Sequence, residues 1–368
     1  MGQRRGRPVE SESQCESRLK KVKIPGKDIV LFARQMTALY RGGIPLVQCL
    51  EILSEQNENP ALAEILGDVS RKISRGLLFS TSLAQYPNAF PKILQVMCRI
   101  GEESGGLDKS LEKVAEWLER DFDLRAKIKS ALSYPFFILA LTGTLTLGLF
   151  YGVMPAFLKI FEDMKVDLPF VTEVVLGFTR ALQSPVVWLL LPLAAGFIHW
   201  QTRVMSTNEP LKRQGYEFLL LIPIWGKILH HGSLSRFCGA AQTLLETGVN
   251  LMLALKLSGA VCGSPVIEHD VEAMIDAVKH GESVSSFMDT RPDIYSRTTI
   301  NFLAAGEEAS NLPAMMRFSA AYHALEAESQ IDALKVAIEP LMLAVIAIVV
   351  GGLVLSIFLP LYGFLDKL

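Results

Sequence analysis

The sequence GEESGGL at residues 101–107 returns as GEEASNL at residues 306–312, which is 205 positions later. The same offset aligns the flanking sequence without a gap over more than 120 residues, and matched pairs include Phe32 with Phe237, Leu39 with Leu244, Gly76 with Gly281, Pro87 with Pro292 and Pro155 with Pro360. Similarity at one fixed distance over such a length indicates an internal duplication. We therefore predict two copies of one unit, with the structural repeat positions Gly43, Gly248, Gly101, Gly306, Pro135 and Pro340.

Within each copy the apolar residues recur at helical spacing. Leu46, Leu50 and Leu53 step by four and by three, which is the spacing of one apolar helix face. Glycine and proline clusters separate such segments as turns, and no alternating run of β-branched residues competes with the helical pattern. The sequence predicts an all-α fold in which each copy is a bundle of about six helices.

Three long uncharged stretches interrupt the polar sequence. They lie between Lys129 and Lys159, between Arg180 and Arg203, and from Pro340 to Leu365. A helix crossing a bilayer core needs about 20 apolar residues. The alternative is a buried helix in a large soluble core, but such helices are usually shorter and carry a polar face. We predict three transmembrane helices.

The predicted organisation follows from the repeat and the spans. Along the chain we expect a disordered basic arm (1–27), a first cytoplasmic helical domain (28–132), transmembrane helix 1 (133–157), a short periplasmic loop (158–183), transmembrane helix 2 (184–202), an amphipathic connector (203–235), a second cytoplasmic domain (236–337) and transmembrane helix 3 (338–363). The second span has no counterpart in the repeat. It returns the chain, so both domains share one side of the membrane.

Basic residues near the span ends orient the chain. Eight Lys or Arg residues flank the spans on the domain side, against four on the other side. Because cytoplasmic loops carry the excess of positive charge, we expect the N-terminus and both domains in the cytoplasm and the C-terminus in the periplasm. Cysteines 15, 49, 98, 238 and 262 show no short pair spacing, and we interpret them as buried or free thiols.

Composition and motifs exclude several classes of function. A net charge of −2 gives no electrostatic case for a nucleic-acid partner. The segment from Gly101 to Gly106 has glycines at the distance found in phosphate-binding loops, but Leu107 and Asp108 follow it where Lys is required. The six histidines show no ligand spacing beyond the adjacent pair His230-His231, which we interpret as a surface pair. We expect no catalytic residue, no cofactor and no metal site, and hence no enzyme.

The two Gly-Glu-Glu segments are the best local candidates for function. In the structural interpretation the glycine breaks one helix, and the acids favour the start of the next helix through its dipole. In the functional interpretation the carboxylates contact a basic partner or another subunit, or hold a cation such as calcium. The four candidate residues are Glu102, Glu103, Glu307 and Glu308.

Two further features also keep two interpretations. Gly43 and Gly248 are either turn glycines or close-packing glycines. An acidic stretch is either a solvated helix face or a docking surface for an ATPase. That stretch comprises Glu112, Glu116, Glu119, Asp121 and Asp123.

Several motifs occur in an order that resembles a known family. They are Phe32-Ala33-Arg34-Gln35-Met36, Gly43-Ile44-Pro45-Leu46, Gly101-Glu102-Glu103-Ser104-Gly105, Tyr134-Pro135, Pro223-Ile224-Trp225-Gly226, Gly306-Glu307-Glu308 and Glu339-Pro340. Together they resemble the type II secretion system F family, which includes the inner-membrane platform proteins of type IV pilus machines. The resemblance covers roughly residues 28–365.

The resemblance implies a function and a set of partners. It implies a bacterial inner-membrane platform that couples a cytoplasmic hexameric secretion ATPase to the assembly of pilin or pseudopilin subunits. It also implies contacts with inner-membrane pilus assembly proteins, with membrane lipid and with further copies of the chain. The alternative is an oligomeric component of a membrane transporter, although no ionisable residue lies mid-span. A pilus, a secretion machine and a DNA-uptake machine all remain open.

Overall fold

A computed structural model describes residues 18–152 and 209–365, with six single positions between them at 157, 173, 177, 184, 193 and 196. The chain divides into two compact units. The first unit combines Met1–Ala126 with Leu229–Ala327, and the second combines Lys127–Ile228 with Glu328–Leu368. Both copies of the repeated domain therefore belong to the first unit.

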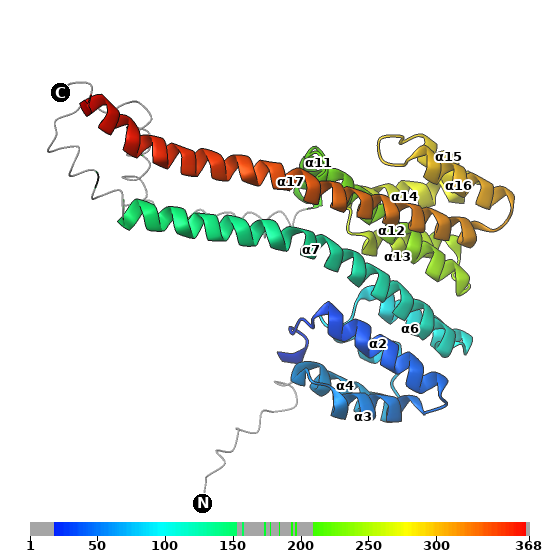
Figure 1. The fold of residues 1–368 in the computed structure, drawn as a ribbon. Helices are drawn as coiled ribbons and strands as arrows, with labels where there is room; N and C mark the ends of the chain where they lie inside the picture. The colour runs from blue at the N-terminus through cyan, green and yellow to red at the C-terminus, as the bar shows by residue number, and fades with distance from the viewer. Residues whose placement is uncertain are drawn as a thin grey trace, which may run out of the picture. The chain divides into compact units, whose positions relative to one another are not determined.

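Each copy forms six helices within the described residues (Figure 1). The first domain contains α2 (Gly26–Arg41), α3 (Leu46–Gln56), α4 (Pro60–Ser74), α5 (Phe79–Ala84), α6 (Lys92–Ser104) and the start of α7 (Leu107–Gly152). The second contains α12 (Trp225–Glu246), α13 (Leu251–Cys262), α14 (Pro265–Lys279), α15 (Val284–Asp289), α16 (Arg297–Glu308) and the start of α17 (Leu312–Leu365). No strand occurs in these parts of the chain. The predicted all-α, duplicated fold is confirmed.

Turn glycines end equivalent helices in the two copies. Gly43 and Gly248 have φ of +85° and +84°, and no atom lies within 4 Å of a Cβ built on either residue. A positive φ without close neighbours is a requirement of the turn itself, so these are turn glycines and not close-packing glycines. Helices α4 and α14 also begin alike, because Asn59 and Ser264 cap them before a proline at the first helical position.

The first domain begins earlier than the predicted boundary at residue 28. Leu19 and Ile24 are buried in its core, and the Asn88 side chain donates a hydrogen bond of 2.8 Å to the Lys20 carbonyl. The lysines around these residues dominate the composition of that stretch and predict a disordered arm. Residues 18–27 instead pack against the domain.

Helices α7 and α17 are long enough and apolar enough to cross a membrane. Only 6% of each apolar window is buried, whereas a soluble-core helix of this composition would be mostly covered. The predicted first residues of the two spans, 133 and 338, fall inside these helices. The charged half of each helix is followed by its apolar half without a turn signal in the sequence. Pro135 and Pro340 lie within them.

The remaining predicted segments are described only in part. Predicted transmembrane helix 2 (184–202) and the loop before it (158–183) lie outside the described residues, apart from single positions. In the predicted connector (203–235), α11 (Glu209–Leu220) precedes α12, and α12 begins at Trp225. The expected start of the second domain at 236 therefore falls inside a helix.

Candidate functional site

The first glutamate of each Gly-Glu-Glu segment caps a short helix of its own domain. The Glu102 carboxylate accepts hydrogen bonds from the backbone N–H of Phe79 (2.5 Å), the N–H of Ser80 (3.2 Å) and the Ser80 hydroxyl (2.5 Å). These donors are the first residues of α5, whose N–H groups have no partner within the helix. Glu102 therefore satisfies the start of α5.

The second copy repeats this arrangement. Glu307 accepts from the N–H of Val284 (2.6 Å), the N–H of Ser285 (3.3 Å) and the Ser285 hydroxyl (2.5 Å) at the start of α15. A carboxylate also interacts favourably with the positive end of a helix dipole. The acids thus stabilise a helix start, as expected, but it is the preceding helix in the sequence and not the following one.

The glycines of the two segments lie inside helices and do not break them. A Cβ on Gly101 would lie 2.7 Å from the Leu107 Cα, and a Cβ on Gly306 would lie 2.9 Å from Met315 side-chain atoms. Only glycine allows α6 and α16 to approach the start of the next helix so closely. The expectation that these glycines end a helix was wrong, since α6 ends at Ser104, before Gly105 with φ of +71°.

The second glutamate of each segment faces solvent. Glu103 is 63% exposed in its side chain and pairs with Arg99 at 2.8 Å, and Glu308 is exposed at the end of α16. Within the described residues, no group of three His, Cys, Asp or Glu side chains could hold a metal ion. Of the four candidate glutamates, Glu103 and Glu308 are the two that a partner could reach.

The acidic stretch of α7 contacts the neighbouring helix. Glu112 pairs with Arg41 and Glu119 with Arg34, both on α2, while Asp121 pairs with Arg125 at 2.9 Å on α7 itself. Exposed ion pairs of this kind contribute at most about 1 kcal/mol each. The acidic stretch is therefore a helix face that forms ion pairs with α2. It is not a freely solvated face.

The two domains contact each other through α7 and α12. A Cβ at Gly239 would lie 3.6 Å from the Trp117 ring, and the Lys113 ammonium lies 2.8 Å from the Glu246 carboxylate. Ala240 and Leu244 of α12 belong to the same core cluster as the first domain. This interface was not predicted from the sequence. The sequence does carry a signal for the interface, namely two small residues in α12. Gly239 and Ala240 stand where α2 has Arg34 and Gln35.

The second domain contains a buried polar cluster around His323. Its ring Nε2 lies 2.6 Å from the Thr299 hydroxyl, and its Nδ1 lies 2.9 Å from Nδ1 of His231. Burial lowers the pKa of His323 to about 3 and the pKa of His230 to about 4. His230 and His231 are half-buried, so the interpretation of this pair as a surface pair was wrong.

The first domain has apolar residues at the same positions. Leu94, Leu118 and Gly26 stand where the second domain has Thr299, His323 and His231. The cluster is therefore a property of the second copy alone. The Cys238 thiol adjoins the cluster through Ser319. Burial raises the pKa of Cys238 to about 12 and the pKa of Cys262 to about 11. These thiols stay protonated and unreactive at neutral pH.

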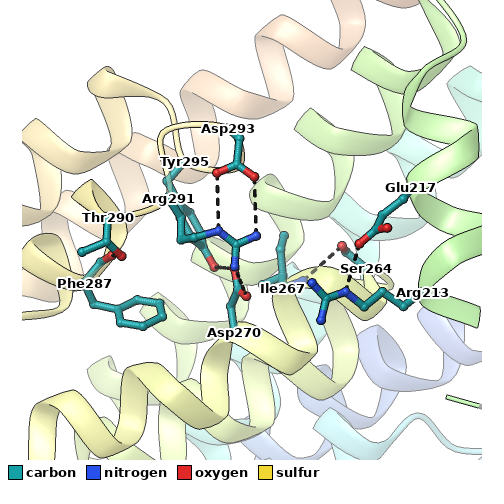
Figure 2. A network of polar contacts seen from close by, with 10 residues as sticks. All are labelled: Arg213, Glu217, Ser264, Ile267, Asp270, Phe287, Thr290, Arg291, Asp293 and Tyr295. Carbon is teal, nitrogen blue, oxygen red and sulfur yellow. Dashed lines mark hydrogen bonds and ion pairs between the residues drawn. The ribbon is translucent and has the colours of Figure 1, made fainter. Parts of the chain in front are cut away.

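A second polar network ties α14 to the segment after α15 (Figure 2). Asp270 is only 3% exposed and accepts from Arg291 at 2.8 Å, and the Tyr295 hydroxyl donates to it at 3.4 Å. Arg291 also pairs with Asp293 at 3.4 Å. Since each buried charge has a partner, the network holds the fold together and leaves no free reactive group.

The first domain makes the same connection from different positions. Asp68 of α4 pairs with Lys72 at 2.8 Å and accepts a hydrogen bond from Tyr86. Asp270 corresponds to residue 65 and Tyr295 to residue 90, so in the first domain the aspartate lies three positions later and the tyrosine four positions earlier. Both copies therefore contain a polar link between these two segments, but different residues form it.

In the second unit, α7 and α17 line a cavity of about 330 Å³. Its lining includes repeat-equivalent positions of the two helices, namely Ser130 with Lys335, Ala131 with Val336 and Tyr134 with Glu339. Pro135 also lines it. The cavity lies where the charged part of each helix gives way to the uncharged part.

These features define a class of protein. The chain is a helical protein built from a tandem-repeated six-helix domain, and each copy ends in a helix that can cross a membrane. The sequence profile described as Type II secretion system (T2SS), protein F, matches residues 32–155 and 237–360. The two matches are themselves 205 positions apart. The chain belongs to this family.

Named relatives share most of the chain. The type IV pilus assembly protein PilC of Thermus thermophilus is 31% identical over 346 residues, covering 94% of this chain and 84% of the relative. PilC of Pseudomonas aeruginosa is 28% identical, covering 92% and 90%. The type II secretion system protein F of Aeromonas hydrophila is 27% identical, covering 91% and 85%.

Proposed function

We propose that this chain is an inner-membrane platform protein of a type IV pilus or type II secretion machine. In this role it couples a cytoplasmic hexameric ATPase to the assembly of pilin or pseudopilin subunits, and it performs no catalysis of its own. The observation that carries the proposal is the match of the family profile to both copies, residues 32–155 and 237–360. Relatives named for pilus assembly and for secretion both align along nearly the whole chain.

The proposed topology has three spans and two cytoplasmic domains. The contact between the two domains through Lys113 and Glu246 supports their location on the same side of the membrane. If the apolar end of α7 crosses once, the chain must cross again before α12. A span within residues 184–202 would provide this second crossing and would leave the C-terminus, after α17, on the periplasmic side.

We further propose that Glu103 and Glu308 contact the partner ATPase or a neighbouring assembly protein. The side chains of Glu103 and Glu308 are exposed. Each follows a glutamate that is already held by hydrogen bonds within its own domain. Charge exchange at exposed sites changes association without a large effect on folding. The two copies present the same carboxylate, one on each domain.

Co-purification in detergent tests the coupling. The full chain is expressed with the tagged secretion ATPase and the pilin of the same organism, and the retained ATPase is quantified. We expect retention by the unaltered chain and a loss of at least half with Glu103→Lys and Glu308→Lys together. Glu55→Lys, an exposed exchange on α3, is the matched control. A chain that retains no ATPase, yet moves a solute across liposomes, would contradict the platform function.

A further inference from the structure

The cavity between α7 and α17 is lined by equivalent residues of the two copies. Its volume of about 330 Å³ falls within the range of pockets that bind small ligands, which is about 300–1,000 Å³. Three equivalent pairs line it, namely Ser130 with Lys335, Ala131 with Val336, and Tyr134 with Glu339. The last pair begins the Tyr-Pro and Glu-Pro motifs, to which the proposed platform function assigns no role.

The prolines of these two motifs leave two backbone carbonyls without their usual donors. Proline has no N–H, so the carbonyl four residues before it loses its hydrogen bond within the helix. For Pro135 that residue is Ala131, and for Pro340 it is Val336. Both residues line the cavity. Each copy therefore contributes one such residue to the cavity wall.

A third acceptor in the wall is the Glu339 carboxylate. Glu339 is exposed, and no described residue forms a hydrogen bond or an ion pair with it. A primary ammonium group has three N–H donors and one positive charge. One carboxylate and two carbonyls match both its donors and its charge. The cavity wall therefore suits a primary ammonium group.

The same wall also carries one positive charge. The Lys335 ammonium lies 2.8 Å from the Asp332 carboxylate in a pair that is exposed on both sides, and such a pair is weak enough to be exchanged for another anion. The described lining has one Lys and one Glu, so its charges balance. Sites for anionic lipid headgroups are instead clusters of Lys and Arg. A ligand with one phosphate and one ammonium complements this lining.

The position of the cavity points to a lipid as that ligand. The charged part of each helix ends here and the uncharged part begins, which places the cavity at the level of the headgroups. Tyr134 is 61% exposed, and tyrosine is enriched at this level of a membrane. Pro135 and Met342 add buried apolar surface to the wall, against which the first carbons of a lipid can pack.

We propose that this cavity binds the headgroup of phosphatidylethanolamine, in which two carbons join a phosphate to a primary ammonium. The ammonium donates to Glu339 and to the carbonyls of Ala131 and Val336, and the phosphate lies against Lys335. A lipid bound in this way contacts α7 and α17 together where they enter the membrane. The site depends on the membrane insertion of these helices and not on the pilus or secretion role.

Lipid titration followed by native mass spectrometry tests the site. The full chain is purified in detergent, delipidated, and titrated with phosphatidylethanolamine, phosphatidylcholine and phosphatidylglycerol that carry the same acyl chains. We expect phosphatidylethanolamine to bind about fivefold more tightly than the other two, because a trimethylated ammonium has no N–H to donate and a glycerol headgroup has no positive charge. Equal binding of the three lipids, or tighter binding of phosphatidylglycerol, would overturn the proposal.

Four variants locate the binding. Pro340→Ala returns an N–H to the Val336 carbonyl without weakening the helix. We expect this variant and Glu339→Gln each to reduce the preference for phosphatidylethanolamine over phosphatidylcholine to less than about twofold. Lys335→Gln should weaken both lipids, which share the phosphate, whereas Lys129→Gln, an exposed position of α7 outside the lining, should weaken neither. An unchanged preference in Pro340→Ala and Glu339→Gln would contradict the site.

Two further measurements separate the lipid from other occupants. Soluble glycerophosphoethanolamine at the same concentration should not displace the lipid, because it lacks the acyl chains. The photoreactive residue p-benzoylphenylalanine in place of Tyr134 should give a lipid adduct in membranes. Displacement by the soluble headgroup, or a protein adduct at this position, would overturn the proposal. Co-purification with the ATPase is a separate readout, so either result leaves the platform function standing.

Discussion

At the scale of single residues, the Gly-Glu-Glu segment joins two structural roles. Gly101 and Gly306 remove the Cβ that would collide with the next helix, and Glu102 and Glu307 cap the short helix before it. The same contacts in both copies account for the glycine and the first glutamate of each segment. Only the second glutamate is left for function.

Replacing the first glutamate should cost stability, whereas replacing the second should not. Glu102→Ala leaves the Phe79 and Ser80 N–H groups of α5 without their acceptor, which costs about 1–3 kcal/mol. Glu103→Ala removes an exposed ion pair and should change the free energy of unfolding by less than about 0.5 kcal/mol. Thermal unfolding of the two variants in detergent, followed by circular dichroism, separates them. Equal losses would contradict the capping role.

The histidine cluster predicts a loss of stability in mild acid. Folding lowers the pKa of His323 to about 3 and of His230 to about 4, whereas an unfolded histidine titrates near 6.5. Below about pH 6.5 the unfolded chain therefore binds protons that the folded chain does not, and each histidine removes up to about 1.4 kcal/mol per pH unit. Stability is retained above that pH.

His323→Gln isolates this contribution. The amide can still hydrogen-bond to Thr299 and His231 but cannot take up a proton. We expect the midpoint of thermal unfolding to fall less steeply between pH 7 and pH 5 in this variant than in the unaltered chain. Because the carboxylates are the same in both proteins, the difference in slope reports His323. Identical slopes would count against its buried, neutral state.

At the scale of helices, sequence predicts the elements well and their environment less well. The spacing of Leu46, Leu50 and Leu53 indicated a helix and a buried face, and Leu50 and Leu53 are buried. The glycines at 43 and 248 marked turns because a positive φ is a local requirement. In contrast, α12 is covered on the face that α2 leaves open, and that difference arises from packing between domains.

The candidate site was predictable only in its location. The sequence indicated the Gly-Glu-Glu segments as the candidate functional site, but it predicted that Glu102 stabilises the start of the following helix. The actual partner of Glu102, Phe79, lies 23 residues earlier in the chain. The histidine cluster was missed for the same reason. His231 and His323 are 92 positions apart, and no local spacing rule connects them.

The α7–α12 contact predicts a size limit at Gly239. Gly239→Ala should be tolerated, since its Cβ would lie at ordinary distances of 3.6–3.8 Å from Trp117 and Ala320. Gly239→Arg introduces the residue that α2 has at this position and has no room beside the Trp117 ring. We expect that variant to lower the stability by about 1–3 kcal/mol and to increase cleavage between the domains in limited proteolysis. Equal behaviour of both variants would argue against the packed interface.

At the scale of the whole molecule, duplication explains the architecture. One unit consists of a six-helix domain whose last helix continues into an apolar segment, and the chain contains it twice. Two such units in direct succession would place their domains on opposite sides of a membrane. In the proposed topology, the contact between the domains calls for an additional crossing, and the span proposed at residues 184–202 would supply it.

The sidedness of the two domains tests this account most directly. Single cysteines are introduced at exposed positions of each domain, Glu55→Cys and Lys279→Cys, and labelled with a membrane-impermeant maleimide in intact cells and in inverted inner-membrane vesicles. We expect both positions to react in the vesicles and neither position to react in intact cells whose outer membrane has been permeabilised. Labelling of the two domains from opposite sides would contradict it.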